Sequence, residues 1–534
     1  MAPRCRSGAQ DSGHRWATTP WVPSPRRGGT APSPARERPG WEQNSAPTPI
    51  GTASGSHRPT AGRSYAEQKH PHPGGPVTRP NILLIVSDDH GYADRSAHDT
   101  PGVKTPVLDR LAAEGATCTD AYVTAPICSP SRAGMITGQY QQRWGGLWFD
   151  SAHIGTAQTI AETLRTAGYV TGYFGKVHYG DETSADRGAP PHHGFEKSFY
   201  GLAGQSMGRL HYRHHSASAV EEYGEAAGPM GVQPFWSGEE PAEFDGFTTD
   251  EIADRAIDFI GGAGDEPYFA MVAFNAVHNF CWQLPDEELA ARGLQGFEDW
   301  HPGASEYLDW YDGAISPNLP DGRAYYLAQL ELMDRAIGRL LAAVEGQDTM
   351  VVYLTDNGGS QCNYGDNGDL RGTKYTLWEG GIRVPFLVRW PGVTTAGSVV
   401  SDPVSALDLA ATFAAAAGTE HVGDGIDLRR PLADAAGDAD RELRSARELH
   451  WDCGWQWAVR RGDWKLLSVS GDDPTARYVA RTEHTETGNG LFLTDLTADR
   501  GEASNLADAR PDLVRELAEA HERWRAEVGL PARD

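Results

Sequence analysis

The sequence has no long run of hydrophobic residues, few cysteines and too few basic residues to balance its acidic ones. No segment approaches the ~18 consecutive apolar residues of a membrane helix, so we expect no membrane span. Six cysteines among 534 residues are too few for a disulfide framework. A formal net charge of −26 argues against a general nucleic-acid binder, because phosphate backbones attract basic surfaces. What remains is an acidic globular chain with room for two or three domains.

The beginning of the chain lacks the aliphatic periodicity of a folded segment. Residues 1–80 hold 14 of the 35 prolines and 11 of the 47 basic residues. This composition is typical of a disordered arm that buries too little surface to fold, and we assign residues 1–79 to such a Pro/Arg-rich arm. No apolar export segment follows its first arginines, which favours the cytoplasm and leaves secretion or the periplasm open.

Short β-branched runs alternate with helical patterns along most of the remaining chain. The run Asn81–Ser87 (NILLIVS) is almost wholly apolar, as expected for a strand covered on both faces. Similar runs recur at Tyr169–Phe174, Tyr268–Phe274, Met350–Thr355 and Val384–Arg389. Helical patterns occupy Thr105–Gly115, Thr156–Gly168, Thr249–Ile260 and Ala324–Glu345. The alternation predicts an α/β domain over residues 80–440, with a mostly parallel central sheet flanked by helices on both faces.

The pattern changes after about residue 440. Short antiparallel strands are expected at Trp457–Arg460, Trp464–Val469 and Leu491–Leu496. A final amphipathic helix is expected at Pro511–Val528. We therefore predict a smaller C-terminal α+β domain over residues 441–534.

Polar and ionisable side chains follow four of the predicted strands. In chain order they are Asp88 with Asp89, Lys176 with His178, Asn275 with His278, and Asp356 with Asn357. Ligands of open α/β sheets bind at the carboxyl ends of the strands. We therefore expect these side chains to converge on one crevice.

The acidic members of this set suggest a metal site. Asp88, Asp89, Asp356 and Asn357 offer oxygen ligands, which suit Ca²⁺ or Mg²⁺. No zinc-type spacing of cysteine and histidine occurs among them. The alternative is that each acidic pair merely caps the following helix, but two such strand ends in one chain favour the metal.

The segment Cys128–Arg132 (CSPSR) places a cysteine at the predicted start of a helix. Pro130 fits the first helical turn, and backbone N–H groups at a helix start bind anions and lower the pKa of a thiol. By itself the motif is also compatible with a buried, inert cysteine.

The CSPSR motif resembles the signature of the type I, formylglycine-dependent sulfatases of the alkaline phosphatase superfamily. The resemblance extends over nearly the whole chain from Pro80, through Pro80–Asp89, Thr105–Gly115, Gly175–His178, Leu370–Pro385 and Leu491–Leu506. It implies oxidation of Cys128 to formylglycine by a formylglycine-generating enzyme. It also implies that Asp88, Asp89, Asp356 and Asn357 bind Ca²⁺ together with the residue derived from Cys128.

The resemblance also assigns the reaction chemistry. Arg132 would hold and polarise the formylglycine, while Lys176 and Lys374 would neutralise the sulfate oxygens. His178 would help to break down the covalent intermediate, and His278 would assist departure of the alcohol with Lys374 as proton donor. The aldehyde hydrates to a geminal diol, so that one hydroxyl attacks sulfur and the other later expels sulfate.

Some of these assignments have simpler alternatives. Lysine is rare, with six lysines against 41 arginines, so Lys176 and Lys374 within motifs are notable. His278 could instead be a satisfied core histidine, and Arg371 is assigned to substrate binding with Lys176, His278 and Lys374 on weaker grounds. The remaining cysteines carry no motif and are expected to be buried free thiols: Cys118, Cys281, Cys362 and Cys453.

The substrate is the least determined part of the prediction. The insertion Ala185–Trp236 contains His192, His193 and the cationic stretch Gly208–His215, which could meet a further anionic group or be a solvated loop. Stacking faces for a ring could come from Trp282, Trp300, Trp310 or Trp451. We expect a small or terminally sulfated carbohydrate or an aryl sulfate. The alternatives are a phosphonate or phosphodiester hydrolase of the same fold, and a non-catalytic binder of sulfated ligands.

Overall fold

The computed structural model describes residues 79–148, 153–181, 183–202, 235–278, 280–297, 319, 321–433, 446–468 and 490–533. The predicted N-terminal arm lies outside the described residues, apart from Arg79. All described residues belong to one compact unit, Gly75–Asp534. None of their helices is both long and apolar enough to cross a membrane.

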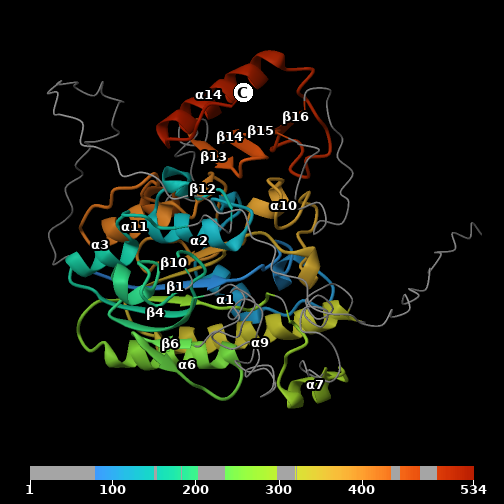
Figure 1. Cartoon of the computed structure of the whole chain (residues 1–534). Helices are drawn as coiled ribbons and strands as arrows, with labels where there is room; N and C mark the ends of the chain where they lie inside the picture. Colours follow the sequence, from blue (N-terminus) through green and yellow to red (C-terminus); the bar gives the residue numbers. More distant parts are fainter. Residues whose placement is uncertain are drawn as a thin grey trace, which may run out of the picture. The chain divides into compact units, whose positions relative to one another are not determined.

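A ten-stranded sheet lies at the centre of this unit, in the order β11-β2-β10-β9-β1-β8-β4-β5-β6-β7 (Figure 1). Its middle strands are parallel: β9 (Thr349–Thr355), β1 (Asn81–Ser87), β8 (Tyr268–Ala273), β4 (Val170–Lys176) and β5 (Lys197–Gly201). Toward the edges the pairs of β10 (Phe386–Arg389) with β9 and with β2 (Ala116–Cys118), of β5 with β6 (Phe235–Ser237), and of β6 with β7 (Glu240–Ala242) are antiparallel. The edge strand β11 (Ser398–Val400) pairs with β2 in parallel. The prediction of a mostly parallel central sheet is confirmed.

Alternate side chains of β1 enter two separate cores. Ile82, Leu84 and Val86 face one core, while Leu83 and Ile85 face the other. The first core is covered by α2 (Cys128–Thr137), α3 (Ile160–Thr166) and α11 (Asp408–Ala416). The second is covered by α1 (Pro106–Glu114), α6 (Thr248–Gly262) and α9 (Gly322–Ala343). Helices therefore cover both faces of the sheet, as predicted, and this explains why β1 has no polar alternation.

Local signals in the sequence begin several of these helices. Pro106 occupies the first turn of α1, where its missing N–H leaves no hydrogen bond unmade. Thr159 and Glu162 form a capping box at the start of α3. The shorter elements are β3 (Ala121–Tyr122), β12 (Val404–Ser405), α7 (Asp286–Arg292), α10 (Glu379–Ile382), α12 (Arg429–Ala433), and the 3-10 turns Ser96–His98, Gln141–Trp144, Pro190–His193 and Gln361–Asn363.

A separate four-stranded antiparallel sheet is formed by the C-terminal residues (Figure 1). Its strands are β13 (Glu448–Asp452), β14 (Trp457–Arg461), β15 (Trp464–Ser468) and β16 (Leu491–Asp495). The helix α14 (Pro511–Glu527) packs on one face through Leu517. On the other face, Trp451 and Phe492 join the core of the central sheet. This sheet therefore packs against the same side of the large sheet as α2.

Candidate active site

The strands β9, β1, β8 and β4 are neighbours and parallel, so their carboxyl ends lie along one edge. Backbone hydrogen bonds tie the segments together beyond these ends. The N–H of Asp88 donates to the carbonyl of Ala276 at 2.9 Å, and that of Asp356 donates to Ser87 at 3.2 Å. The structure thus brings together the predicted acids with Lys176 and His278.

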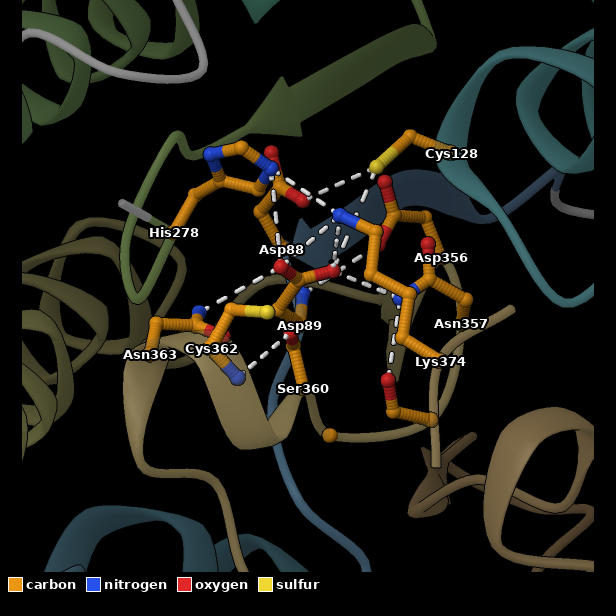
Figure 2. Close-up of polar contacts among 12 residues, drawn as sticks. Asp88, Asp89, Cys128, His278, Asp356, Asn357, Ser360, Cys362, Asn363 and Lys374 are labelled. Carbon is orange, nitrogen blue, oxygen red and sulfur yellow. Dashed lines mark hydrogen bonds and ion pairs between the residues drawn. The ribbon is translucent and has the colours of Figure 1, made fainter. Parts of the chain in front are cut away.

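An acidic cluster occupies this edge (Figure 2). Asp88, Asp89, Cys128 and His278 each present one ligand atom, and these atoms lie within 4.8 Å of one another. Consecutive strand residues point to opposite faces. Asp89 has a φ of 57°, a left-handed conformation that Asp adopts more readily than most residues, and this turn allows two consecutive carboxylates to reach the same cluster.

The donor set fits a hard divalent cation. Asn357 donates through Nδ2 to Asp89 Oδ1 at 2.6 Å, while its buried Oδ1 meets no hydrogen-bond donor among the described residues. A buried amide oxygen without a donor is costly unless another partner satisfies it. Together with the carboxylates of Asp88, Asp89 and Asp356, this oxygen gives the all-oxygen surroundings that Ca²⁺ and Mg²⁺ prefer.

Arg132 and Lys176 compensate the negative charge from two sides. Arg132 is fully buried, and its Nε donates to Asp356 Oδ2 at 2.6 Å. Its Nη1 donates to the backbone carbonyl of Lys176 at 3.0 Å, which fixes α2 against the end of β4. The ammonium of Lys176 donates to Asp88. Every one of these buried charges therefore has an opposite partner, as burial requires.

Lys374 reaches the cluster from the segment before α10. Its Nζ donates to Asp89 Oδ2 at 2.8 Å and lies 3.0 Å from His278 Nε2. Burial disfavours its positive charge, yet the charge of Asp89 raises the pKa of Lys374 above its ordinary value. His278 Nε2 is also 3.5 Å from Asp89 Oδ2. A proton can thus pass between Lys374 Nζ and His278 Nε2.

The pKa values of the Asp88 and Asp356 carboxyl groups are shifted in opposite directions. Burial and the charge of Asp356 raise the pKa of Asp88 to about 7, against the opposing effect of Lys176 and Arg132. Burial alone would raise the pKa of Asp356 as well, but the charges of Arg132, Lys176 and Lys374 hold it below its ordinary value. Without a cation, Asp88 is therefore the group that holds a proton near neutrality.

Cys128 begins α2, as the motif predicts, and lies in the acidic cluster. Its Sγ is 3.4 Å from Asp88 Oδ1 and 4.0 Å from Asp89 Oδ1. The expected lowering of its pKa is wrong: burial, with the charges of Asp356 and Asp88, raises the pKa of this thiol well above its ordinary value. The carboxylates outweigh the helix start. Among the described residues, Cys118, Cys281 and Cys453 are buried thiols outside any disulfide, as predicted, whereas Cys362, also outside a disulfide, is only half-buried.

Asn363 is a member of the site that the sequence analysis did not find. It is buried, and its Nδ2 donates to Asp89 Oδ2 at 3.3 Å (Figure 2). The same Nδ2 donates to the carbonyl of Val277 at 2.7 Å. Asn363 therefore joins the loop after β9 to the loop that carries His278. In the sequence Asn363 lies six residues beyond Asn357, too far to be predicted as part of the strand end.

Two predicted residues occupy other surroundings. His178 follows Lys176 by two residues and is half-buried, and its backbone N–H donates to the carbonyl of Leu202. Its catalytic role stays a prediction. The guanidinium of Arg371 lies 3.8 Å from the centre of the Trp378 ring and donates to the carbonyl of Glu502 at 2.9 Å. These contacts direct Arg371 toward the C-terminal sheet.

The residues predicted to select the substrate are only partly described. Trp282 and Trp451 are buried and offer no open face for stacking. His193 is also buried, and burial lowers its pKa to about 4, so it is a core residue. His192 bonds to the carbonyl of Ser184. The stretch Gly208–His215, Trp300 and Trp310 lie outside the described residues.

Three buried cations gathered around a buried cysteine and paired acids form a site whose charges suit an anionic ligand. The sequence profile of the sulfatase family matches residues 80–419, which include every predicted metal and catalytic residue. The chain belongs to the sulfatase family of the alkaline phosphatase superfamily. Its relatives include sulfuric ester hydrolases.

Comparison with individual relatives agrees with this family. Arylsulfatase A from Bos taurus is 31% identical over 83% of this chain and 86% of its own length. The N-acetylgalactosamine-6-O-sulfatase of Bacteroides thetaiotaomicron is 27% identical over 83% of this chain and 92% of its own. The crystal structure of Ps i-CgsB in complex with k-i-k-neocarrahexaose superposes with a TM-score of 0.66, at 25% identity, over 84% of this chain and 93% of that one.

Proposed function

We propose that this sulfatase removes sulfate from a carbohydrate or aryl sulfate ester, using an oxygen nucleophile derived from Cys128 beside a bound Ca²⁺. The single observation that carries the proposal is the position of Cys128. Its Sγ lies 3.4 Å from Asp88, inside a buried cluster that also contains Arg132, Lys176 and Lys374. A nucleophile held among cations suits attack on an ester whose own negative charge repels nucleophiles.

The residues that would hold Ca²⁺, with Mg²⁺ as the alternative, are Asp88, Asp89, Asp356 and Asn357 together with the side chain derived from Cys128. When bound, the cation supplies positive charge that polarises the ester and acidifies a coordinated hydroxyl. The Asn357 Oδ1 without a hydrogen-bond donor among the described residues and the raised pKa of Asp88 both support the binding of a cation between these side chains.

Formylglycine, made from Cys128 by a formylglycine-generating enzyme, supplies as its hydrate the two hydroxyl groups that a thiol lacks. Arg132 would orient the side chain at position 128, because its guanidinium is fixed between Asp356 and the carbonyl of Lys176. Lys176 and Lys374 would meet the sulfate oxygens, since their ammonium groups point into the same cluster.

Proton transfer falls to the histidines and Lys374. The 3.0 Å separation between Lys374 Nζ and His278 Nε2 lets this pair pass a proton to the oxygen of the departing alcohol. His178, at the end of β4, is the residue we assign to proton removal at position 128, because an imidazole is partly deprotonated near neutral pH.

The test is peptide mass spectrometry across Cys128 on protein made with and without a formylglycine-generating enzyme. Conversion of the thiol to the aldehyde removes about 18 Da, and the peptide containing Cys362 serves as an unconverted internal control. We expect aryl sulfate hydrolysis from the converted protein alone. A thiol that persists at position 128 in an active preparation would overturn the proposed nucleophile.

The same preparation separates sulfate from phosphorus chemistry. Assays of matched aryl sulfate, phosphonate monoester and phosphodiester substrates compare the leading proposal with its alternative. We expect the sulfate ester to have the highest kcat/KM, because two lysines and an arginine face the site. A Cys128→Ala variant gives the background, and equal turnover by this variant would point to a contaminating enzyme.

A further inference from the structure

A group of three half-buried aromatic side chains lies next to the lysine of the active site. Tyr375 follows Lys374 directly, and its ring centre is 6.2 Å from that of Trp148. Trp148 in turn contacts Trp455 edge-on, with ring centres 4.5 Å apart. All three side chains keep part of their surface exposed. We refer to Tyr375, Trp148 and Trp455 as the aromatic wall.

The wall extends to the reacting groups through Tyr375. The ammonium of Lys374 lies 5.5 Å from the centre of the Tyr375 ring, and the same ammonium bonds to Asp89. Burial is the main reason that the pKa of the Tyr375 phenol is raised. The charge of Asp89 and the side chain of Cys128 also act on this phenol. Tyr375 is therefore close to the place where a sulfate group would sit.

The backbone of Tyr375 is held in a conformation that an aromatic residue rarely adopts. Its φ is 80°, in the left-handed region, which costs free energy for a residue with a bulky side chain. Its N–H donates to the carbonyl of Pro126 at 2.7 Å, and its carbonyl accepts from Gln456 Nε2 at 2.7 Å. Both backbone groups are thus fixed, and such strain is typical of functional positions.

Other aromatic residues near the site do not offer a comparable surface. The Trp378 ring is covered by the guanidinium of Arg371 at 3.8 Å and is buried. Trp282 and Trp451 are buried in cores. Among the aromatic residues named here, only Tyr375 combines partial exposure with a position beside the ammonium of Lys374. Trp148, and then Trp455, are joined to it by ring contacts.

We propose that the aromatic wall binds the ring of the alcohol portion of the substrate, so that the enzyme selects sulfate esters of cyclic alcohols over acyclic ones. This inference rests on the proposed function and specifies its substrate class. Pyranose and aryl rings both present a flat face with apolar C–H or π surface, and aromatic side chains bind such faces. With sulfate held at Lys176 and Lys374, the ring lies against Tyr375 and points outward along Trp148 and Trp455.

The decisive variants replace Tyr375. Tyr375→Asn removes the ring but suits the left-handed backbone, and Tyr375→Phe keeps the ring and removes only the hydroxyl. We expect Tyr375→Asn to raise KM for an aryl sulfate and for a monosaccharide sulfate by about tenfold, with kcat changed less than threefold. For propyl sulfate we expect KM within twofold of the unmodified protein. Tyr375→Phe should restore the KM for both cyclic substrates.

Binding without turnover gives a second readout. In a Cys128→Ala background, calorimetric titration with the aryl sulfate should show about tenfold weaker binding after Tyr375→Asn. Trp464→Leu is the control, because Trp464 is equally half-buried but contacts Arg510 on the C-terminal sheet, and it should change neither value.

An equal KM increase for propyl sulfate, or none for the cyclic esters, would overturn the wall as a substrate contact. If the converted protein hydrolyses no sulfate ester at all, the proposed function fails instead. An effect limited to one of the two cyclic substrates identifies whether the wall serves a sugar or an aryl ring and still supports it.

Discussion

Asp356 occupies the most demanding electrostatic position in the site. It is completely buried, yet its carboxylate stays ionised because Arg132 Nε donates to it at 2.6 Å and two lysines lie nearby. A buried ion pair contributes little net stability compared with an apolar pair, but removal of one partner leaves a charge that nothing compensates. The chain therefore depends on keeping both Asp356 and Arg132.

Replacement of Asp356 by Asn should destabilise the protein strongly. We expect a loss of about 3–5 kcal/mol in the free energy of unfolding, measured by urea denaturation in a chelator so that no metal contributes. Asp369→Asn is the matched control, since Asp369 pairs with Arg500 at 2.6 Å on the surface and should cost less than about 1 kcal/mol. Similar losses for the two variants would contradict this account of the buried pair.

Residues directly after strands could be predicted from the sequence because strand ends in a parallel sheet share one edge. Asp88, Asp356 and Lys176 follow that rule and meet as expected. Asn363 and Tyr375 could not be found this way, since loop geometry brings them to the site. The pKa of Cys128 was misjudged for a related reason: burial and neighbouring charges depend on the tertiary fold.

At the scale of elements, the C-terminal sheet holds the segment that carries Lys374. Lys465 on β15 pairs with Glu379 at 2.9 Å and with Glu502 at 3.0 Å, and all three side chains are buried. Gln456 accepts a hydrogen bond from the backbone N–H of Leu377 at 3.1 Å in addition to its bond to Tyr375. The small sheet thus fixes the position of Lys374 from behind.

Replacement of Lys465 by Met removes the positive charge between two buried acids. Burial raises the pKa of Glu502 to about 7, so this group can take up a proton in mildly acidic solution. We expect Lys465→Met to lower the free energy of unfolding by about 3–5 kcal/mol at pH 8, where both acids are ionised, and by less at pH 5.5. Urea denaturation at the two pH values measures this difference, and a loss independent of pH would refute it.

The elements themselves were predicted with uneven success, for physical reasons. Apolar runs such as Asn81–Ser87 fall where β1 is observed, because a strand buried on both faces needs them. The first strand of the small sheet, β13, was not predicted, since the sequence ELHWD mixes charged and aromatic residues without a regular period. Its residues are ordered by pairing with β14, a contact that local sequence does not encode.

For the molecule as a whole, cation binding should couple to stability and pH. A ligand that binds only the folded state adds about 2.7 kcal/mol at one hundred times its Kd. We expect Ca²⁺ to raise Tm relative to a chelator, and to do so more at pH 8 than at pH 5.5, because the proton on Asp88, whose pKa is about 7, competes with the cation. Differential scanning fluorimetry measures both effects.

The paired variants Asp88→Asn and Asp94→Asn sharpen this test. Asp94 is also buried, but it bonds to Tyr326 and Arg323 and is not in the cation cluster. Each variant is compared with and without Ca²⁺. The Ca²⁺-dependent rise in Tm should vanish in Asp88→Asn and persist in Asp94→Asn. A rise that survives in both would place the cation elsewhere.

The burial of Cys128 also limits the time during synthesis in which its thiol is accessible to another protein. Cys128 is 1% exposed, and the charged residues that act on its thiol include Asp356, which is synthesised about 230 residues later. At about 5–20 residues per second, that stretch takes roughly 10–50 s to make. Under the proposed function, an enzyme that oxidises this thiol would have to act on the growing or newly released chain, and translation speed and the supply of that enzyme would together set the fraction of active molecules.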